Sequence, residues 1–136
     1  MNTEGGGGFR RRRRGPGGPS EAPGGLGEHK RSLIETGLLI ALLEESRHGY
    51  ALIERVDQLV GGQVYVDPGS VYRILRLLEQ AGVVSSTWEA GTSGPQRRTY
   101  TVEPSGRDLL RSWAGILAQR GSALVDLSEL AQERLA

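Results

Sequence analysis

The residues best suited to chemistry lie between positions 67 and 82. Apolar side chains recur there every three or four residues, as on one side of a helix, and polar side chains fall on the other side. At about 100° per residue, one side of a helix here would be apolar: Val71, Ile74, Leu75, Leu78 and Ala81. The polar side chains expected to face outward are Ser70, Tyr72, Arg73, Arg76 and Gln80. An arginine fork can bind phosphate or a guanine edge, and a short helix fits the major groove of DNA. The pattern predicts a DNA-reading helix; the alternative is an ordinary amphipathic surface helix.

The two ends of this helix are also indicated by the sequence. Asp67 can accept hydrogen bonds from the free backbone N–H groups of a first turn, and Pro68 suits the first helical position. Gly82 suits the position just past a helix, where a left-handed conformation is common. We therefore expect a helix that begins after Asp67 and ends before Gly82.

A second pair of cationic side chains, Arg97 and Arg98, follows a segment that contains Gly and Pro. Residues 83–89 are rich in Val, Thr and Trp and predict a strand, and residues 97–102 predict another. The two strands would form a hairpin, or wing, with its loop at residues 90–96. Arginines at this place would contact the sugar-phosphate backbone, which positions a protein on DNA without reading bases.

Two further helices are predicted before the DNA-reading helix. The first runs from Ser32 to about Ser46, with Ser32 and Glu35 as a capping box. After a break at residues 47–49, the second helix spans residues 49–60. Its expected buried residues are Tyr50, Ile53, Val56 and Leu59 or Val60. Three short helices, the last two joined by a Gly-containing turn, have the layout of a helix-turn-helix domain.

A long final helix is expected to open at Pro104. Its apolar positions recur at close to seven residues per two turns: Leu110, Trp113, Leu117, Leu124, Leu127 and Ala131. This stripe has more apolar surface than one winged domain can cover, so we expect pairing with a second subunit. Because glycine weakens a helix, Gly115 and Gly121 predict a bend or break near Gly121.

Composition separates a basic tail from the folded part. Residues 1–31 are rich in Gly and Pro and carry seven Lys or Arg against three Glu, so we expect them to be disordered. The run Arg10 to Arg14 could bind nucleic acid without sequence preference; a solubilising tail is the alternative. Residues 32–103 are expected to form a winged helix DNA-binding domain, and residues 104–136 a C-terminal dimerisation helix. Residues 32–136 carry ten Arg against thirteen acidic residues, so any contact of the folded part with nucleic acid must be local.

Several classes of function are not supported by the sequence. The chain has no cysteine, which excludes disulfides and thiolate chemistry and fits a reducing compartment. The longest apolar run, residues 37–43, is too short to span a bilayer, and no stretch resembles a signal peptide, so a cytoplasmic protein is expected. His48, Asp67 and Ser70 match no catalytic motif, phosphate-binding loop or metal-ligand spacing. We expect neither an enzyme nor a bound metal or cofactor.

Five runs of residues are similar to motifs of one family. They are His48-Gly49-Tyr50, residues 68–72 (Pro-Gly-Ser-Val-Tyr), residues 78–84 (Leu-Glu-Gln-Ala-Gly-Val-Val), residues 94–100 (Gly-Pro-Gln-Arg-Arg-Thr-Tyr) and Gly106-Arg107. Together they resemble the PadR-like winged-helix transcriptional regulators over residues 32 to about 112. The resemblance implies a mainly α fold with a small β-hairpin: a winged helix-turn-helix domain followed by a C-terminal dimerisation helix.

The resemblance also implies a function. Members of the family are homodimers joined through the last helix, bind near-palindromic operators and mostly repress transcription. Their effectors are usually small aromatic or amphipathic compounds, bound in some members beside a Trp of the last helix. The residues that would form an effector pocket or the dimer interface here are Leu110, Trp113, Leu117 and Leu124. Core packing is the alternative for Trp113, and a winged-helix module that binds protein or RNA with its basic tail is the alternative function.

Three positions depart from the pattern of the family. Arg73 stands where many members have Pro, which adds a cation to the expected groove face. Glu103 replaces the usual Thr before the last helix and is a poorer cap. His29 is the one His of the tail, so the metal-binding tail of some relatives is not supported here.

Overall fold

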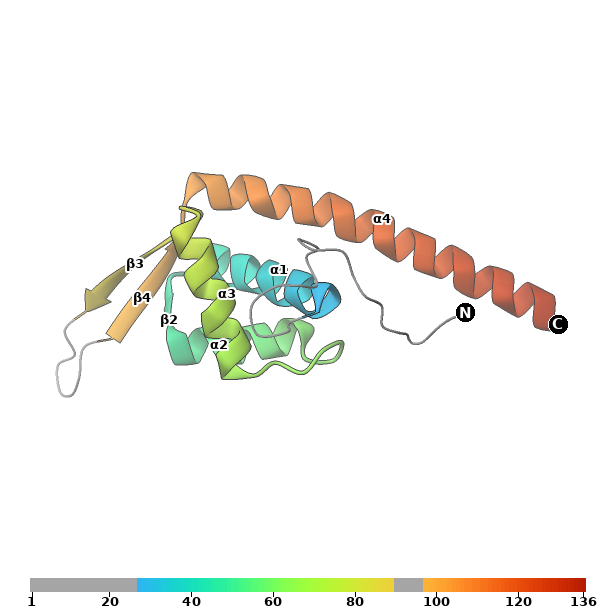
Figure 1. The fold of residues 1–136 in the computed structure, drawn as a ribbon, viewed down its shortest axis with the longest axis horizontal. Helices are drawn as coiled ribbons and strands as arrows, with labels where there is room; N and C mark the ends of the chain where they lie inside the picture. Colours follow the sequence, from blue (N-terminus) through green and yellow to red (C-terminus); the bar gives the residue numbers. More distant parts are fainter. Residues whose placement is uncertain (1–26, 90–96) are drawn as a thin grey trace. The chain divides into compact units, whose positions relative to one another are not determined.

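The computed structural model describes residues 27–89 and 97–136, which form a mainly helical fold with a small antiparallel sheet (Figure 1). The elements in chain order are α1 (Glu28–Glu44), β2 (Arg47–His48), α2 (Gly49–Val60), α3 (Pro68–Gln80), β3 (Val84–Glu89), β4 (Arg97–Val102) and α4 (Pro104–Leu135). The predicted fold class is thereby confirmed. The chain divides into two units, residues 1–31 and residues 32–136. Most of the predicted tail (residues 1–26) and the predicted loop of the wing lie outside the described residues.

Helix α3 has the two ends that the sequence predicted. Asp67 is extended, and its carboxylate accepts a hydrogen bond of 2.9 Å from the backbone N–H of Ser70. Pro68 opens the helix, and Gly82 has a left-handed φ of 80° just past its end. Both signals act within a few residues of the chain, which is why they can be recognised in the sequence.

Apolar side chains from α1, α2 and α3 form the core. Those with at most 1% of their surface exposed on these helices are Ile34, Leu38, Leu39, Ala41, Leu52, Val56, Val71, Ile74 and Leu75. The predicted inner face of α3 is confirmed for four of its five residues. Ala81 is the exception: it is exposed, because the helix has already ended at Gln80.

Helix α1 begins earlier than predicted. It starts at Glu28, and Ser32 is buried inside the helix, where its carbonyl accepts a hydrogen bond of 2.7 Å from the Thr36 hydroxyl. The predicted capping box of Ser32 and Glu35 is therefore wrong. The residues that precede Ser32 include good helix formers, and Glu28 is favourable in a first turn, so the helix extends toward the N-terminus.

Helix α2 has the predicted bounds, and Val56 is buried as predicted, but the other fully buried residue is Leu52 and not Tyr50. Tyr50 is 74% exposed, whereas Leu52 and Val56 are fully buried. The prediction that Tyr50 belongs to the core is wrong. Leu52 and Val56 lie four residues apart on one face, and it is this face that packs on the neighbouring helices.

The sheet has three strands in the order β2-β4-β3, all antiparallel. The predicted break at residues 47–49 contains a short strand, in which Arg47 pairs with Tyr100 and His48 with Thr99. The predicted hairpin is confirmed by β3 and β4, where Val84 pairs with Val102. The sheet therefore joins the segment between α1 and α2 to the wing.

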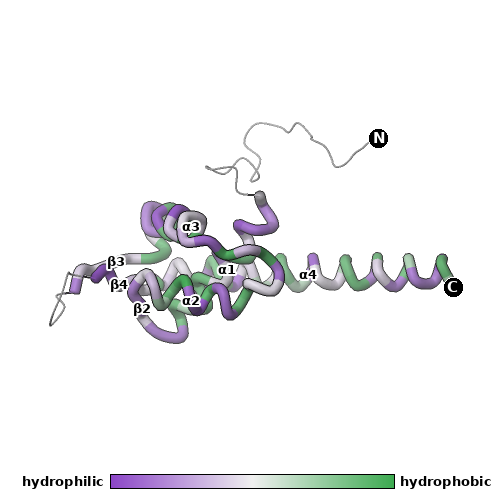
Figure 2. The backbone as a smooth tube through the Cα atoms, turned by 90° about the horizontal axis from the view of Figure 1, so that it is seen from below, coloured by the Kyte–Doolittle hydropathy of each residue, from purple (hydrophilic) through white to green (hydrophobic). Residues whose placement is uncertain are grey.

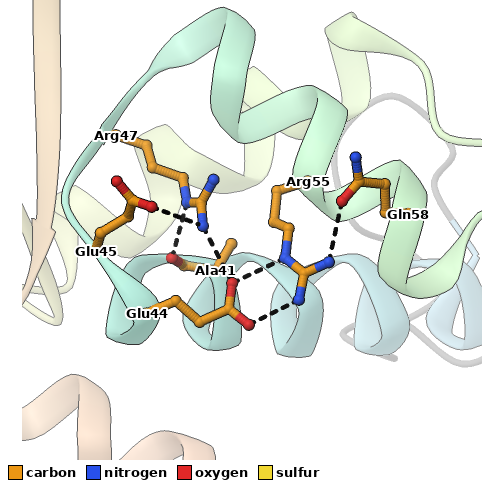
Figure 3. A network of polar contacts seen from close by, with 6 residues as sticks. All are labelled: Ala41, Glu44, Glu45, Arg47, Arg55 and Gln58. Atoms are coloured by element: carbon orange, nitrogen blue, oxygen red, sulfur yellow. Dashed lines mark hydrogen bonds and ion pairs between the residues drawn. The ribbon is translucent and has the colours of Figure 1, made fainter.

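A polar network ties the end of α1 to α2 (Figure 3). The guanidinium of Arg55 donates two hydrogen bonds of 2.8 and 2.7 Å to the Glu44 carboxylate. These bonds from Arg55, with a smaller contribution from Arg47, lower the pKa of Glu44 below its usual value. Arg47 also donates a 3.1 Å hydrogen bond to the carbonyl of Ala41, which holds β2 against the end of α1.

Helix α4 opens at Pro104 as predicted but continues through Gly121 to Leu135. The predicted break near Gly121 is therefore wrong. From Gly121 to the C-terminus every residue is exposed, and Figure 2 shows hydrophobic and hydrophilic residues recurring along this helix. Among the described residues, no helix is long and apolar enough to cross a membrane.

Candidate nucleic-acid interface

The outward side of α3 carries a mixture of cationic and hydrogen-bonding side chains. Arg76 and Gln80 are exposed, Arg73 is half-buried, and Tyr72 is 37% exposed. These four residues lie on the side of α3 away from its buried apolar face, as predicted. They could reach base edges or phosphates if this helix entered a major groove.

Ser70 does not belong to this outward face. It is only 5% exposed, and its hydroxyl donates a 2.8 Å hydrogen bond to the Asp67 carboxylate. The prediction that its side chain faces a groove is therefore wrong. The carboxylate binds both the hydroxyl and the backbone N–H of Ser70, so this serine completes the first turn of α3.

Tyr72 lies against the first turn of α2. A Cβ atom added at Gly49 would overlap the Tyr72 hydroxyl and lie 3.0 Å from its ring atom Cε1. Gly49 is therefore required for the close approach of the Tyr72 ring. The two residues belong to separate motifs of the sequence, and their contact follows only from the fold.

A groove of about 540 Å³ opens between α2, α3 and β4. Its lining residues are His48, Gly49, Tyr50, Tyr72, Arg97, Arg98 and Tyr100. No binding role was predicted from the sequence for Tyr50 or Tyr100. No local signal indicated this role for Tyr50, because its exposure and its place in a groove with Arg97 follow from the packing of the elements. An exposed tyrosine at such a place is available for hydrogen bonding.

Tyr100 forms the inner part of this groove and is 8% exposed. Burial raises the pKa of its phenol above the usual value, and the nearby Arg98 partly offsets this effect. The phenol therefore stays protonated and can act as a hydrogen-bond donor at neutral pH.

The two arginines of the wing differ in their surroundings. Arg97 is exposed, and its Nη1 atom lies 3.5 Å from Nε2 of His48. Arg98 instead donates a 3.1 Å hydrogen bond to the carboxylate of Glu79 on α3. Both side chains are exposed, but Arg97 is open to an anion from solvent, while Arg98 is already paired with a carboxylate of the protein.

The four residues assigned to an effector pocket or dimer interface separate into two groups. Trp113 is half-buried, and its indole N–H donates a 2.6 Å hydrogen bond to the Glu35 carboxylate on α1. Leu110 and Leu117 are also half-buried, whereas Leu124 is 59% exposed. The first half of α4 thus packs on the winged part, and the second half presents apolar side chains to solvent.

The fold and the basic outward face of α3 define a winged helix-turn-helix protein. A family model, the transcriptional regulator PadR-like family, matches residues 38–112. The chain belongs to this family, as the sequence motifs predicted. The family is one of transcriptional regulators and not of enzymes, which agrees with the sequence analysis. Within residues 27–89 and 97–136, no three His, Asp or Glu side chains are grouped so that they could hold a metal ion.

Individual relatives agree with this assignment. A Mycobacterium tuberculosis protein named "Probable transcriptional regulator Rv1176c" is 31% identical over 96 residues, which cover 67% of this chain and 51% of that protein. The chain therefore spans about half the length of this relative. A PadR-like transcriptional regulator from Bacillus cereus has a TM-score of 0.60 at 22% identity, covering 71% of this chain and 92% of that one. Bacillus subtilis PadR, solved in complex with operator DNA, has a TM-score of 0.54 at 18% identity, covering 60% of this chain and 47% of that one.

Proposed function

We propose that this protein binds double-stranded operator DNA as a homodimer and represses transcription, with release by a small-molecule effector. The observation that carries the DNA-binding part is the outward face of α3, which presents Arg73, Arg76 and Gln80. A groove lined by Tyr72 of the same helix and by Arg97 adds a second cationic surface. The complex of Bacillus subtilis PadR with operator DNA supports the same assignment.

In this proposal α3 enters the major groove, and its polar side chains have distinct roles. Arg76 and Gln80 are exposed and long enough to reach base edges. Tyr72 and Arg73 lie nearer the first turn and would contact bases or the adjacent phosphates. Ser70 would act indirectly, through the first turn of α3, because its side chain is buried.

The groove beside α3 would take one phosphate of the DNA backbone. Arg97 supplies a cation there, and the hydroxyls of Tyr50 and Tyr72 supply neutral donors. The backbone N–H groups of the first turn of α2, which begins at Gly49, are further donors at the favourable end of the helix dipole. Such a contact would fix the protein on the duplex without reading its sequence.

The exposed second half of α4 supports the homodimer. Leu124, Leu127 and Leu130 are 59, 63 and 44% exposed on this helix, and leucines at such spacing are commonly buried against a partner helix. A two-fold axis between the α4 helices would present two α3 helices to a near-palindromic operator.

Repression and effector release rest on the resemblance to the family. A small aromatic or amphipathic compound would bind between subunits near Trp113, beside Leu110 and Leu117. Its binding would change the angle between the two winged parts and so weaken their joint contact with the operator. The Trp113 to Glu35 hydrogen bond lies on this route, because it connects α4 to α1 within each subunit.

DNA binding can be tested by fluorescence anisotropy with DNA from upstream of the gene and with scrambled DNA, at about 50 and 200 mM salt. The proteins compared are the full chain, Arg76→Ala and the control Arg134→Ala, which removes the same charge near the C-terminus. We expect Arg76→Ala to weaken binding to the upstream DNA by about 1 to 3 kcal/mol and to relax sequence preference, and Arg134→Ala to leave both unchanged.

The opposite result would reject this function. Equal, salt-sensitive binding of all three proteins to both DNAs would indicate contacts by the tail alone, since the run Arg10 to Arg14 attracts any polyanion. If Arg76→Ala left specific binding unchanged, the assigned face of α3 would be wrong.

A further inference from the structure

A group of five side chains, here called the Arg98 cluster, joins the wing to the end of α3. Its members are Glu79 from α3 and Ser86, Trp88, Arg98 and Tyr100 from the two wing strands. Arg98 donates through Nε to the Ser86 hydroxyl at 2.8 Å and through Nη2 to the Glu79 carboxylate at 3.1 Å. The Ser86 hydroxyl in turn donates to the same carboxylate at 2.5 Å. The three polar groups therefore form a closed triangle.

Two aromatic rings hold the guanidinium of Arg98 in this position. Its Cζ atom lies 5.4 Å from the ring centre of Trp88 and 6.0 Å from that of Tyr100. Both distances lie within the range of cation–π attraction. A planar guanidinium that is stacked and bound on two nitrogens has little freedom left, so Arg98 is not available as an extended phosphate ligand.

The register of the wing explains why Arg98, and not Arg97, has this position. Trp88 pairs directly with Arg98, and Ser86 pairs with Tyr100, so these four side chains lie on one face of the hairpin. The same face carries the buried Val84, and it turns toward α3. Because side chains alternate along a strand, Arg97 must point to the other face, toward His48.

We infer that Arg98 is a positioning residue, which fixes the wing against the C-terminal end of α3 and so sets the distance between base-reading and phosphate-binding side chains. This inference rests on the proposed DNA-binding function. It also explains why a carboxylate, that of Glu79, lies close to a surface that would meet a polyanion. An unpaired carboxylate there would oppose DNA binding, whereas one paired with Arg98 orders the surface.

The competing assignment is that Arg98 binds a phosphate directly, as the sequence analysis predicted. The two assignments make opposite predictions for Glu79→Gln. Removal of a negative charge beside a phosphate ligand frees Arg98 and should tighten DNA binding. Removal of the anchor of a positioning residue should weaken it.

The experiment measures operator affinity of the full chain from about 50 to 200 mM salt for Glu79→Gln, Arg98→Gln, the double variant and the control Arg97→Gln. We expect each single variant of the cluster to weaken binding by about fivefold, the scale of a partly exposed ion pair, with the salt dependence unchanged. The double variant should be no weaker than either single one. Arg97→Gln should lower the slope of log affinity against log salt by about 0.9, the value for one lost phosphate contact.

Arg98→Lys provides a second variant that keeps the charge but lacks the planar fork. A positioning role predicts a loss similar to that of Arg98→Gln, because a lysine lacks the planar fork that binds Ser86 and Glu79 through separate nitrogens beside the rings of Trp88 and Tyr100. Tighter binding by Glu79→Gln, or a slope lowered by about 0.9 in Arg98→Gln, would overturn the inference and restore the phosphate contact.

Hydrogen exchange of the β3 and β4 amides without DNA separates this inference from the proposed function. We expect faster exchange in Glu79→Gln than in Arg97→Gln, because only the former releases the wing from α3. Unchanged exchange in Glu79→Gln would overturn the positioning contact. If exchange rises but the unaltered chain has no preferred DNA, the contact exists, and the DNA-binding function is the part that fails.

Discussion

The winged part of the chain and the second half of α4 use the same apolar residue types with opposite results. In α1, Ile34, Leu38 and Leu39 are fully buried against neighbouring helices. In α4, Leu124 and Leu127 are 59 and 63% exposed although they also recur at helical spacing. The difference teaches that an apolar stripe predicts burial but does not say whether the covering surface belongs to the same chain.

The largest expected difference between the two regions is in the effect of removing a leucine side chain. Leu38→Ala should lower the free energy of unfolding by about 3 kcal/mol, because it leaves a cavity among fully buried neighbours. Leu127→Ala is the matched variant in the exposed half of α4. Urea unfolding at several protein concentrations distinguishes the two variants. The decrease in the free energy of unfolding should be independent of protein concentration for Leu38→Ala and should become larger with protein concentration for Leu127→Ala. Similar decreases in the free energy of unfolding for both variants at every protein concentration would contradict this difference between the two regions.

A charge in the exposed stripe should break the proposed dimer without unfolding the winged part. Leu124→Glu should raise the dimer dissociation constant at least about 100-fold, because the interface would bury an unpaired carboxylate. Sedimentation equilibrium measures this constant. Ser122→Glu adds the same charge on the opposite side of α4 and should leave the constant nearly unchanged. A monomeric unaltered chain, or equal effects of the two variants, would contradict the assignment of this stripe to a partner helix.

The junction between the two regions depends on Gly106. A Cβ atom there would lie 2.5 Å from the Val83 carbonyl oxygen and 2.5 Å from Cγ2 of Val102. Gly106→Ala should therefore destabilise the fold by about 2 kcal/mol through overpacking, measured by thermal or urea unfolding. Gly121→Ala in the same helix is the control and should stabilise by about 0.5 to 1 kcal/mol, since no described atom lies within 4 Å of its added Cβ. A stabilising Gly106→Ala would show that α4 does not pack on the wing as described.

The wing illustrates what could have been inferred from the sequence. Alternation along residues 97–102 places Arg98, Tyr100 and Val102 on one face, and the apolar character of the last two indicates that this face turns inward. The face of the strand on which Arg98 lies could therefore be predicted from the sequence. Its partner Glu79 could not be predicted, because nothing local relates a residue of α3 to one on the second wing strand.

Strand β2 shows the same limit for secondary structure. It contains only Arg47 and His48, and it exists because β4, about fifty residues later in the chain, supplies the hydrogen bonds. No propensity or pattern of two residues indicates a strand, so the sequence predicts a break. The burial of Leu52 in place of Tyr50 has a related cause, since the side of α2 that is buried depends on where α1 and α3 lie.

By itself the sequence determined the ends of α3, the bounds of α2, the hairpin and the family. Caps, strand alternation and short motifs depend on residues close together in the chain, and their physical effects do not require the rest of the fold. Only the tertiary structure decided that Ser70 is buried, that Tyr72 lies on Gly49, that Trp113 binds Glu35 and that Arg98 turns to Glu79. The last three contacts join different elements, and the packing of those elements sets which of several polar side chains face solvent and which are bound within the protein.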